Sequence, residues 1–437
     1  MTTYHDIIHG EIDIGLAPEG KLVRDLLSCP EVQRLRHVRL LNFDVPALQE
    51  LATARRFAHA VGTCHLTISL CSRSFLPAER RRVLVASALL HDIGVPPYGH
   101  LVEAALQSVD STFSHEALFR EIVHGTYHPT NIYHQILPGQ SLRVSSVLRR
   151  HGVDPDDVIA VVQPGRGASS PICADIDIDN IDNVHRMAAL IGMDAGRENA
   201  RKMLRHMSLT DKGEITFDSA AIETMAVWSD LRATLYGLMI GHPDCVAYNA
   251  YIQDVVRLAV ECGMILPSEW YLSDRQLEER LLEDHRTSGL AVQLLQGCQY
   301  ALVDYVWVHG VDDPRWKVLA DELPGRLPAP PVPGARYFTW SERGKIRRGV
   351  TVLLAGARSE RFGESTASLL VALISPGPGH RSAADDFQRN EREAWRNAVV
   401  AIATTIAPGL DFHAAFPENF SLGHVGPRPQ AVQYELL

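Results

Sequence analysis

Helical spacing of apolar residues, repeated through the first two thirds of the chain, restricts the fold more than any other feature of the sequence. The spacing covers residues 31–41, 55–72, 79–92, 175–191 and 217–262. In each segment, apolar side chains recur at steps of three or four and so form one apolar face. The third segment runs into Gly94, Pro96 and Pro97, which stop a helix. We therefore expect packed helices over these residues.

The pattern changes at a proline-rich stretch. Residues 324–333 contain five prolines and predict an extended connector rather than a helix. Beyond it, residues 349–355 and 367–375 predict strands, and residues 389–406 predict a helix. The sequence thus predicts a mainly α protein in three parts. These are a helical core at 1–322, a connector at 323–336 and a smaller α+β subdomain at 337–437.

Composition restricts the class of function. The chain has 437 residues, 46% hydrophobic and 22% charged, which allows a large core. Its apolar runs are far shorter than the roughly 18 residues of a membrane helix, and its start lacks a signal-peptide pattern. The net charge of −10 opposes general attraction to nucleic acid. Seven scattered cysteines argue against disulfides and indicate a cytoplasmic setting. We expect an intracellular catalytic protein.

Three short segments carry side chains suited to chemistry. His91 and Asp92 stand together at a predicted helix end, where imidazole and carboxylate can both turn toward one ion. His59 lies in an apolar-striped helix, where a core histidine is the simpler interpretation. In His115-Glu116, a carboxylate adjoins an imidazole as in a proton-transfer pair. Taken singly, each of these also fits a surface or core position.

A cluster of aspartates favours a functional site over these surface or core interpretations. Asp175, Asp179, Asp182 and Arg186 fall at i, i+4, i+7 and i+11, which predicts one face of a helix. They could form a solvated acidic face, but the isoleucines between them favour partial burial. A buried carboxylate cluster needs a cation. Two histidines with two aspartates suit Mn²⁺, Fe or Zn²⁺ better than Ca²⁺.

Taken in chain order, the sequence resembles the HD-domain phosphohydrolases, and within them the deoxynucleoside triphosphate triphosphohydrolase branch that includes the SAM-and-HD-domain dNTPases. The resemblance covers roughly residues 4–260. Its segments are Asp6–Gly10, Ser28–Arg36, Arg56–His59, His91–His100, His115-Glu116, Asp177–Asp182 and, less closely, Ala247-Tyr248.

This resemblance implies roles for individual residues. The implied metal ligands are His59, His91, Asp92 and Asp179; the implied catalytic residues are His115, Glu116 and His100; the implied substrate contacts are Arg56 and Tyr248. It further implies a divalent metal ion (Mn, Fe, Mg, Co or Zn), with a metal-bound water attacking the phosphorus next to the sugar of a nucleotide. The implied fold is a helical HD core with an α+β appendage, assembled as a homodimer or homotetramer.

The chain departs from the family pattern at residues that contact the phosphates of the substrate. A phosphate-facing histidine is replaced by Val95, and a lysine and a tyrosine that hold phosphates are replaced by Asn180 and Asn183. A charge-assisted phosphate contact contributes roughly 1.5–3 kcal/mol. We therefore expect a substrate with fewer phosphates, such as a monophosphate, or a modified nucleotide.

Three other functions remain open on the sequence alone. The first is an inactive HD scaffold that binds a nucleotide as a sensor, which the altered phosphate contacts favour and the retained metal and acid residues oppose. The second is a single-strand nuclease, which the acidic charge opposes. The third is a di-iron oxygenase, whose additional ligands we could not place in the sequence.

Overall fold

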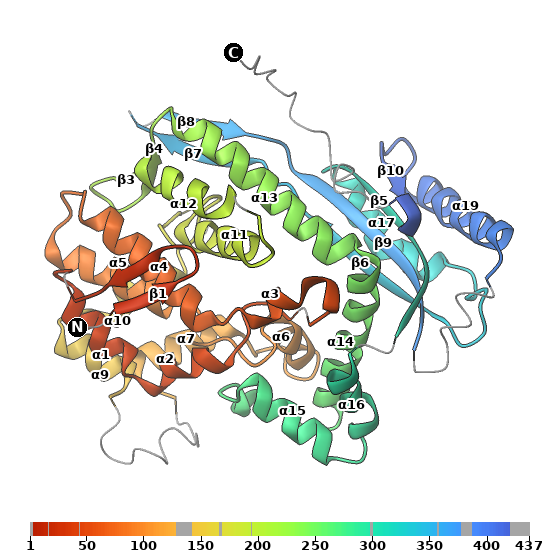
Figure 1. The fold of residues 1–437 in the computed structure, drawn as a ribbon, viewed down its shortest axis with the longest axis horizontal. Helices are drawn as coiled ribbons and strands as arrows, with labels where there is room; N and C mark the ends of the chain where they lie inside the picture. Colours follow the sequence, from red (N-terminus) through yellow and green to blue (C-terminus); the bar gives the residue numbers. More distant parts are fainter. Residues whose placement is uncertain are drawn as a thin grey trace.

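A computed structural model describes residues 3–15, 17–42, 44–127, 142–165, 168–193, 195–297, 300–355, 358–376 and 387–419. Helices dominate the described residues, and the larger sheets draw their long strands from the C-terminal third (Figure 1). The predicted mainly α class is therefore confirmed.

Helices make up most of the first 300 residues. They are α1 (Gly20–Leu27), α2 (Pro30–Arg34), α3 (Gln49–Thr53), α4 (Arg56–Cys71), α5 (Ala78–Leu90), α6 (His100–Gln107), α7 (His115–His124), α9 (Val144–Arg150), α10 (Pro155–Val162), α11 (Ile178–Leu190), α12 (Ala195–Arg205), α13 (Ala221–Gly241), α14 (Pro243–Glu261), α15 (Asp274–Glu283) and α16 (Ser288–Gln296). Two further helices, α17 (Arg315–Arg326) and α19 (Arg389–Ile406), pack beside the C-terminal sheet.

The strands form three sheets. They are β1 (Thr3–Asp6), β2 (Gly10–Asp13), β3 (Met207–Leu209), β4 (Ile215–Phe217), β5 (Ala301–Val311), β6 (Arg336–Arg343), β7 (Val350–Leu354), β8 (Arg358–Phe362), β9 (Thr366–Ser375) and β10 (His413–Ala415). The sheet orders are β1-β2, β10-β5-β9-β6 and β3-β4-β7-β8. All pairs are antiparallel except β4 with β7.

Several predicted elements are confirmed. Helices α4 and α5 occupy the segments predicted at 55–72 and 79–92, and α13 and α14 fill most of 217–262. Helix α5 ends at Leu90, just before the predicted stop. Strands β7 and β9 and helix α19 match the C-terminal predictions. The period of the apolar residues was a reliable guide wherever a whole face is buried.

The single helix predicted at 31–41 is wrong. Helix α2 ends at Arg34, a 3₁₀ turn follows, and Val38 is extended with φ −118° and ψ 123°. There the backbone N–H of Arg56 donates to the Val38 carbonyl at 3.1 Å, so the chain pairs across to the start of α4. A step of three apolar residues fits a 3₁₀ turn as well as an α-helix, which explains the error.

The proline-rich connector starts later than predicted. Helix α17 continues through Pro324 to Arg326, so the expectation of an extended connector is wrong for residues 324–326. Strand β5 lies before the connector, yet it pairs with β9 across ten registered residues. The sheet thus joins residues on both sides of the division predicted at 322, and we propose that the α+β subdomain starts with β5.

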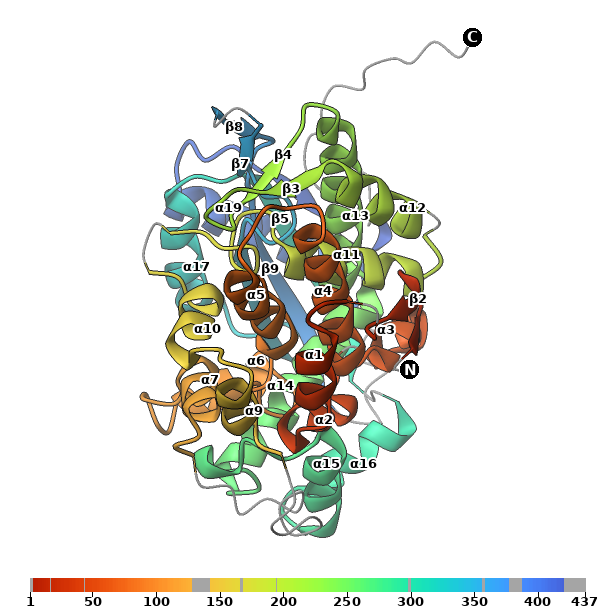
Figure 2. The ribbon, with the colours of Figure 1, turned by 90° about the vertical axis from the view of Figure 1, so that its left-hand side faces the viewer.

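Helix α4 packs against both α5 and α11 at the centre of the helical part, and α13 runs along α11 (Figures 1 and 2). Their buried faces belong to one large apolar core that also includes Val350 and Val352 of β7. A separate core fills the space between the long sheet, α17 and α19. In the described part of the chain, no helix has the length and apolarity needed to cross a membrane.

Candidate functional site

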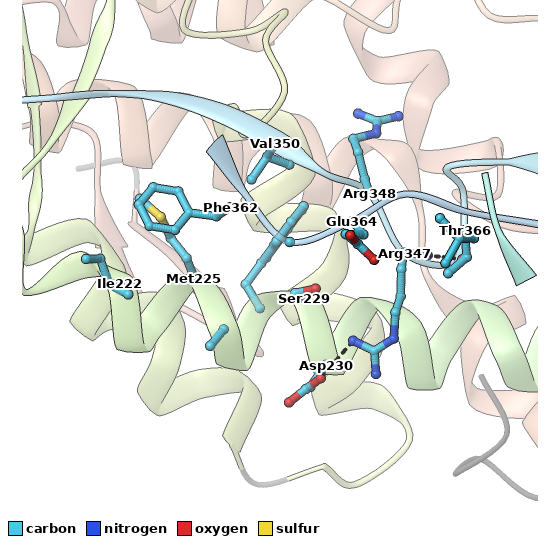
Figure 3. Close-up of a pocket in the computed structure, with 14 residues that line it drawn as sticks. Ile222, Met225, Ser229, Asp230, Arg347, Arg348, Val350, Phe362, Glu364 and Thr366 are labelled. Atoms are coloured by element: carbon cyan, nitrogen blue, oxygen red, sulfur yellow. Dashed lines mark hydrogen bonds and ion pairs between the residues drawn. The ribbon is translucent and has the colours of Figure 1, made fainter. Parts of the chain in front are cut away.

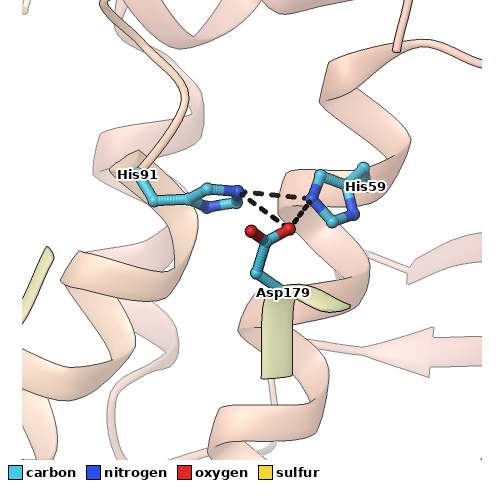
Figure 4. Close-up of side chains that lie close together, drawn as sticks. All are labelled: His59, His91 and Asp179. Carbon is cyan, nitrogen blue, oxygen red and sulfur yellow. Dashed lines mark hydrogen bonds and ion pairs between the residues drawn. The ribbon is translucent and has the colours of Figure 1, made fainter. Parts of the chain in front are cut away.

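His59, His91 and Asp179 converge on one point from three elements. His59 comes from the first turn of α4, His91 from the end of α5 and Asp179 from the first turn of α11 (Figure 4). The Nε2 atoms of the two histidines lie 3.3 Å apart, and Asp179 Oδ1 lies 2.8 Å from His59 Nε2 and 3.8 Å from His91 Nε2. Donor atoms bound to one ion at about 2.0–2.1 Å are spaced by roughly 3 Å. The three side chains therefore fit a metal centre.

Hydrogen bonds on the far side of each ring aim the Nε2 atoms at this point. His91 Nδ1 donates to the Ala88 carbonyl at 2.9 Å, and His59 Nδ1 donates to Asp182 Oδ2 at 2.7 Å. Because both acceptors can only accept, each Nδ1 carries the proton, and neutral Nε2 is the atom left to coordinate. Such partners fix the tautomer of ligating histidines in metal sites.

Asp182 is a fully buried carboxylate that holds this arrangement together. Its two oxygens accept hydrogen bonds from His59 Nδ1, from His9 Nε2 at 2.8 Å, and from Nε and NH2 of Arg186 at 2.9 and 3.0 Å. Arg186 NH1 also donates to Asp6 Oδ2 at 2.8 Å. The β1–β2 hairpin is thus tied to the ligand helix through charged groups that satisfy one another.

The close packing explains Gly62. A Cβ atom at this position of α4 would lie 2.1 Å from Asp182 Oδ1 and 2.6 Å from Arg186 NH2. Only a residue without a side chain lets α4 approach α11 closely enough for His59 to reach Asp182.

The aspartates of the segment 175–182 are divided among different tasks. Asp175 lies before α11, so the single helical face predicted for Asp175 to Arg186 is wrong; its Oδ2 accepts from the Thr351 backbone at 2.8 Å. Asp177 caps the helix by accepting from the Asn180 backbone N–H. Asp179 alone faces the two imidazoles. An N-cap aspartate ends the face because its backbone is not helical.

Burial and charge set the protonation of this cluster. Burial lowers the pKa of His59, but hydrogen bonds with Asp179 and Asp182 outweigh it and raise the pKa to about 10. For Asp182, burial raises the pKa, but the charge of Arg186 and the hydrogen bonds from His59 and His9 hold it well below its ordinary value. The carboxylates are therefore ionised at neutral pH, and His59 holds a proton when no ion is bound.

Metal affinity is therefore expected to rise with pH. Because the pKa of His59 is raised to about 10, an ion that binds at neutral pH must displace one proton. One released proton increases affinity about tenfold per pH unit, and this gain ends above the His59 pKa. Calorimetric titration of Mn²⁺ from neutral to mildly alkaline pH measures the slope. An affinity independent of pH would mean that His59 is not a ligand.

Asp92, the fourth expected ligand, lies beside the cluster but is paired with an arginine. Its Oδ2 lies 3.6 Å from His91 Nε2 and accepts from Arg56 NH1 at 2.7 Å. Burial raises the pKa of Asp92, but the Arg56 guanidinium brings it below the ordinary value. Arg56 is 7% exposed, and its Nε has no partner. Asp92 is therefore adjacent to the three-residue cluster and paired with Arg56.

A second cluster lies at the start of α6 and α7. The Glu103 carboxylate accepts from Nδ1 of His100 at 2.9 Å, from Nδ1 of His115 at 2.7 Å and from the His115 backbone at 3.0 Å. Glu116, the carboxylate expected to hold His115, lies 3.4 Å from its Nδ1 and is half exposed. Glu103 therefore takes the orienting position that the sequence analysis gave to Glu116.

These contacts shift the pKa values of His115 and Glu103 in directions that suit proton transfer by His115. Burial lowers the pKa of His115, but the hydrogen bond to Glu103 outweighs it and raises the pKa, with smaller contributions from Glu116 and Asp92. Burial raises the pKa of Glu103, but His100 and His115 lower it well below the ordinary range. His115 is thus held in one tautomer with Nε2 directed away from Glu103.

The remaining predicted residues differ in placement. Tyr248 is 2% exposed on α14 and packs in the main core, with its ring 5.9 Å from that of Tyr251. Val95 is buried and apolar. Asn183 lies one turn after Asp179 on α11, and its buried Oδ1 has no partner. A buried acceptor without a donor is unusual and marks a place that a ligand's donor could satisfy.

Sequence reasoning missed the supporting residues. Asp182 and His9 were part of the family motifs but received no role, and Glu103 was not noted. A usable signal existed for Glu103, because His100 and Glu103 stand at i and i+3 of one helix. For Asp182, the spacing shows only the i, i+4 pair with Arg186. Its other partners, His9 and His59, are 173 and 123 residues away in sequence.

Comparison with protein families agrees with this geometry. Residues 56–187 match the family profile described as HD domain. The matched range contains His59, His91, Asp92, His100, Glu103, His115, Asp179 and Asp182. Residues 56–187 are therefore similar to an HD domain, and this range includes both clusters.

Two similar curated proteins are uncharacterized. YwfO of Bacillus subtilis is 24% identical over 245 residues, which are 55% of this chain and 52% of YwfO. MJ1154 of Methanocaldococcus jannaschii is 24% identical over 299 residues, which are 64% of this chain and 57% of that protein. The chain thus spans just over half the length of these relatives.

Solved structures extend the likeness of the fold. A hypothetical protein from Aquifex aeolicus has a TM-score of 0.57 and 14% identity, covering 90% of this chain and 99% of its own. A phosphohydrolase from Bacteroides thetaiotaomicron has a TM-score of 0.57 and 15% identity, covering 85% and 99%. At such low identity these similarities concern the fold alone.

Proposed function

We propose that the protein is a metal-dependent phosphohydrolase that acts on a nucleotide at the phosphorus next to the sugar. The observation that carries the proposal is the pairing of two clusters in one HD domain. His59, His91 and Asp179 fit a metal ion, and His115, held by Glu103, fits a proton donor. The likeness to a phosphohydrolase from Bacteroides thetaiotaomicron supports the same class of reaction.

His59, His91 and Asp179 would hold the ion, with Asp92 joining them on release from Arg56. Histidine nitrogens with carboxylate oxygens suit Mn²⁺, Fe²⁺, Co²⁺ or Zn²⁺, with Mg²⁺ less favoured. A bound divalent ion supplies a Lewis acid for a phosphoryl oxygen and lowers the pKa of a coordinated water.

The side chains themselves handle charge and protons. Arg56, once separated from Asp92, would bind a phosphoryl oxygen through its guanidinium, a charge-assisted contact. His115 would give a proton from Nε2 to the oxygen of the leaving sugar, because Glu103 holds Nδ1 and raises the His115 pKa. His100, at 71% side-chain exposure, would close the outer side of the site.

Glu103→Gln tests the proton donor. The amide removes the charge that raises the His115 pKa, so turnover is expected to fall by up to about 100-fold, the lower end of a general acid's contribution. Because His115 must be protonated to act, the alkaline limb of the pH–rate profile moves to lower pH. Glu116→Gln, which changes a half-exposed carboxylate, should have the smaller effect. Equal profiles for wild type and Glu103→Gln would remove His115 from this role.

The substrate is expected to carry few phosphates or a modified sugar. Val95, Asn180 and Asn183 replace three polar or charged phosphate contacts of the dNTP triphosphohydrolases that the chain resembles. Hydrolysis next to the sugar does not need the outer phosphates. Within this proposal, a monophosphate or modified nucleotide is therefore favoured over an ordinary deoxynucleoside triphosphate.

Product analysis by ion-exchange chromatography tests the function. The protein is loaded in turn with Mn²⁺, Fe²⁺, Mg²⁺ or Co²⁺ and given mono-, di- and triphosphates of ribo- and deoxynucleosides, with Asp92→Ala as the control. Release of phosphate, pyrophosphate or triphosphate, lost in the variant, supports the proposal. Metal binding with no product from any substrate contradicts it and favours a nucleotide-binding sensor.

A further inference from the structure

Tyr98 holds a backbone conformation that a tyrosine rarely adopts. Among the described residues, it is the one non-glycine residue with a positive φ, at 57°. A bulky side chain is strained in this left-handed region, so neighbouring groups must hold the turn. Tyr98 stands between α5 and α6, in the segment that begins with His91 and Asp92 and leads into His100. The strain therefore lies in the segment that joins the two clusters.

Two carboxylates of α15 hold this turn in place. The Tyr98 backbone N–H donates to Asp274 Oδ1 at 2.9 Å, and the Tyr98 hydroxyl donates to Glu278 Oε1 at 2.7 Å. Tyr98 and Asp274 are both buried, and a buried backbone N–H needs an acceptor from the protein. Asp274 and Glu278 therefore stabilise the strained conformation from outside the turn.

The same two carboxylates hold the extended chain at Val38 and Arg39. The Arg39 backbone N–H donates to Asp274 Oδ2 at 2.7 Å, and Arg39 NH1 donates to Glu278 Oε1 at 2.7 Å. The Arg39 guanidinium also lies 5.6 Å from the centre of the Tyr98 ring, a distance that suits a cation–π contact. Each carboxylate thus binds both segments and fixes them relative to each other.

The two segments meet again at Arg56. On one side, the Arg56 backbone N–H donates to the Val38 carbonyl at 3.1 Å. On the other side, Gly99 lies against the guanidinium, because a Cβ atom at Gly99 would be 3.0 Å from Arg56 NH2. Gly99 has φ 56° and ψ −135°, which glycine adopts without strain. Both the backbone and the charged tip of Arg56 therefore lie next to chain that α15 fixes.

We propose that Asp274 and Glu278 are positioning residues for Arg56. Through Tyr98 and Arg39, they set where the guanidinium lies beside its partner Asp92. The consequence for a phosphoryl group rests on the proposed function, whereas the position of Arg56 does not. Helix α15 lies beyond the residues that match the HD profile and apart from α11 in both views (Figures 1 and 2), so the site depends on a helix outside the matched range.

The NMR signal of the Arg56 Nε–H group, in full-length protein labelled at arginine with heavy nitrogen, tests the positioning without any turnover. Its loss in Arg56→Lys assigns it. Glu278→Ala removes the acceptor that Tyr98 and Arg39 share, so the Arg56 signal is expected to shift. Asp274→Asn, which can no longer accept from both backbone N–H groups, should shift it as well. An Arg56 signal equal in wild type and both variants overturns the proposal.

Two control variants make the shift specific. Glu279→Ala removes the next carboxylate of α15, which is exposed and pairs with Arg275 at 2.8 Å, and should leave the Arg56 signal in place. Asp230→Ala removes the partner of Arg347, 3.1 Å away beside the cavity between α13 and the β7–β8 hairpin (Figure 3). The Arg347 signal should then shift while the Arg56 signal does not, which shows that the method detects a lost carboxylate.

Kinetics connect the position of Arg56 to the proposed function. If Arg56 binds a phosphoryl oxygen, kcat/KM of Glu278→Ala falls by about 2- to 10-fold, the range of one hydrogen bond, with unchanged metal content. In an Arg56→Gln background the same change should have no further effect, since Glu278 acts through Arg56. An equal loss in both backgrounds would overturn the proposal. Absence of hydrolysis in the wild type counts against the proposed function alone, and the Arg56 signal still decides the positioning.

Discussion

Replacing Asp179 by alanine is expected to abolish metal binding and hydrolysis while leaving the fold intact. The carboxylate is the one anionic member of the His59, His91 and Asp179 cluster, so its loss leaves two neutral nitrogens. The effect on affinity should exceed the roughly 10- to 100-fold that loss of a residue supporting a ligand costs. Asp179 is 35% exposed in its side chain, so its removal leaves little buried space.

Metal content of the dialysed protein and product release are the two readouts for this variant. Asp175→Ala is the matched control, because it removes an aspartate four residues earlier that lies outside α11 and contacts Thr351. The control should bind metal and turn over normally. Normal metal content in Asp179→Ala would place the metal elsewhere.

Asp182→Ala is expected to cause the largest loss of stability among the site variants. It leaves His9, His59 and Arg186 without their shared buried acceptor. Breaking a buried charged network typically costs about 3–5 kcal/mol of unfolding free energy. Denaturant unfolding measures the change.

Two comparisons make the result specific to the network. Asp182→Asn keeps the size of the side chain and should destabilise less, while lowering metal affinity because the His59 ring loses a charged partner. Asp157→Ala changes an exposed carboxylate on α10 and should stay within about 0.5 kcal/mol of wild type. If Asp182→Ala is as stable as Asp157→Ala, the network does not support the fold.

Periodic burial explains which elements could be predicted. Helices α4 and α5 bury whole faces, and the apolar spacing predicts them within one or two residues. Segment 31–41 has the same spacing but turns into extended chain at Val38, because its backbone pairs with the start of α4. The partner of Val38 in this pairing, Arg56, lies outside the segment. The spacing of apolar residues within the segment therefore cannot predict the pairing.

Strand β5 was missed for a related reason. Its central residues, Val303 to Val308, are buried on both faces, since helices cover one side of the sheet and α14 the other. A strand buried on both sides does not alternate between apolar and polar residues. Pro324 misled in the opposite direction, because α17 continues through it to Arg326.

The candidate site could likewise be predicted only in part from the sequence. Histidine and aspartate at helix ends are visible as residue types, and the structure brings His59, His91 and Asp179 within reach of one ion. Which carboxylate supports which imidazole depends on the tertiary fold. Glu103 and Asp182, rather than the neighbours in sequence, orient His115 and His59.

Hydrolysis in heavy-oxygen water by the metal-titrated protein tests the central claim most directly. The chelated protein receives Mn²⁺ stepwise with the best substrate of the nucleotide panel, and mass spectrometry locates the label. The account predicts that turnover rises to a plateau as the His59, His91 and Asp179 site fills, with the label in the phosphate product. Label in the nucleoside, or turnover unaffected by chelation, would contradict it.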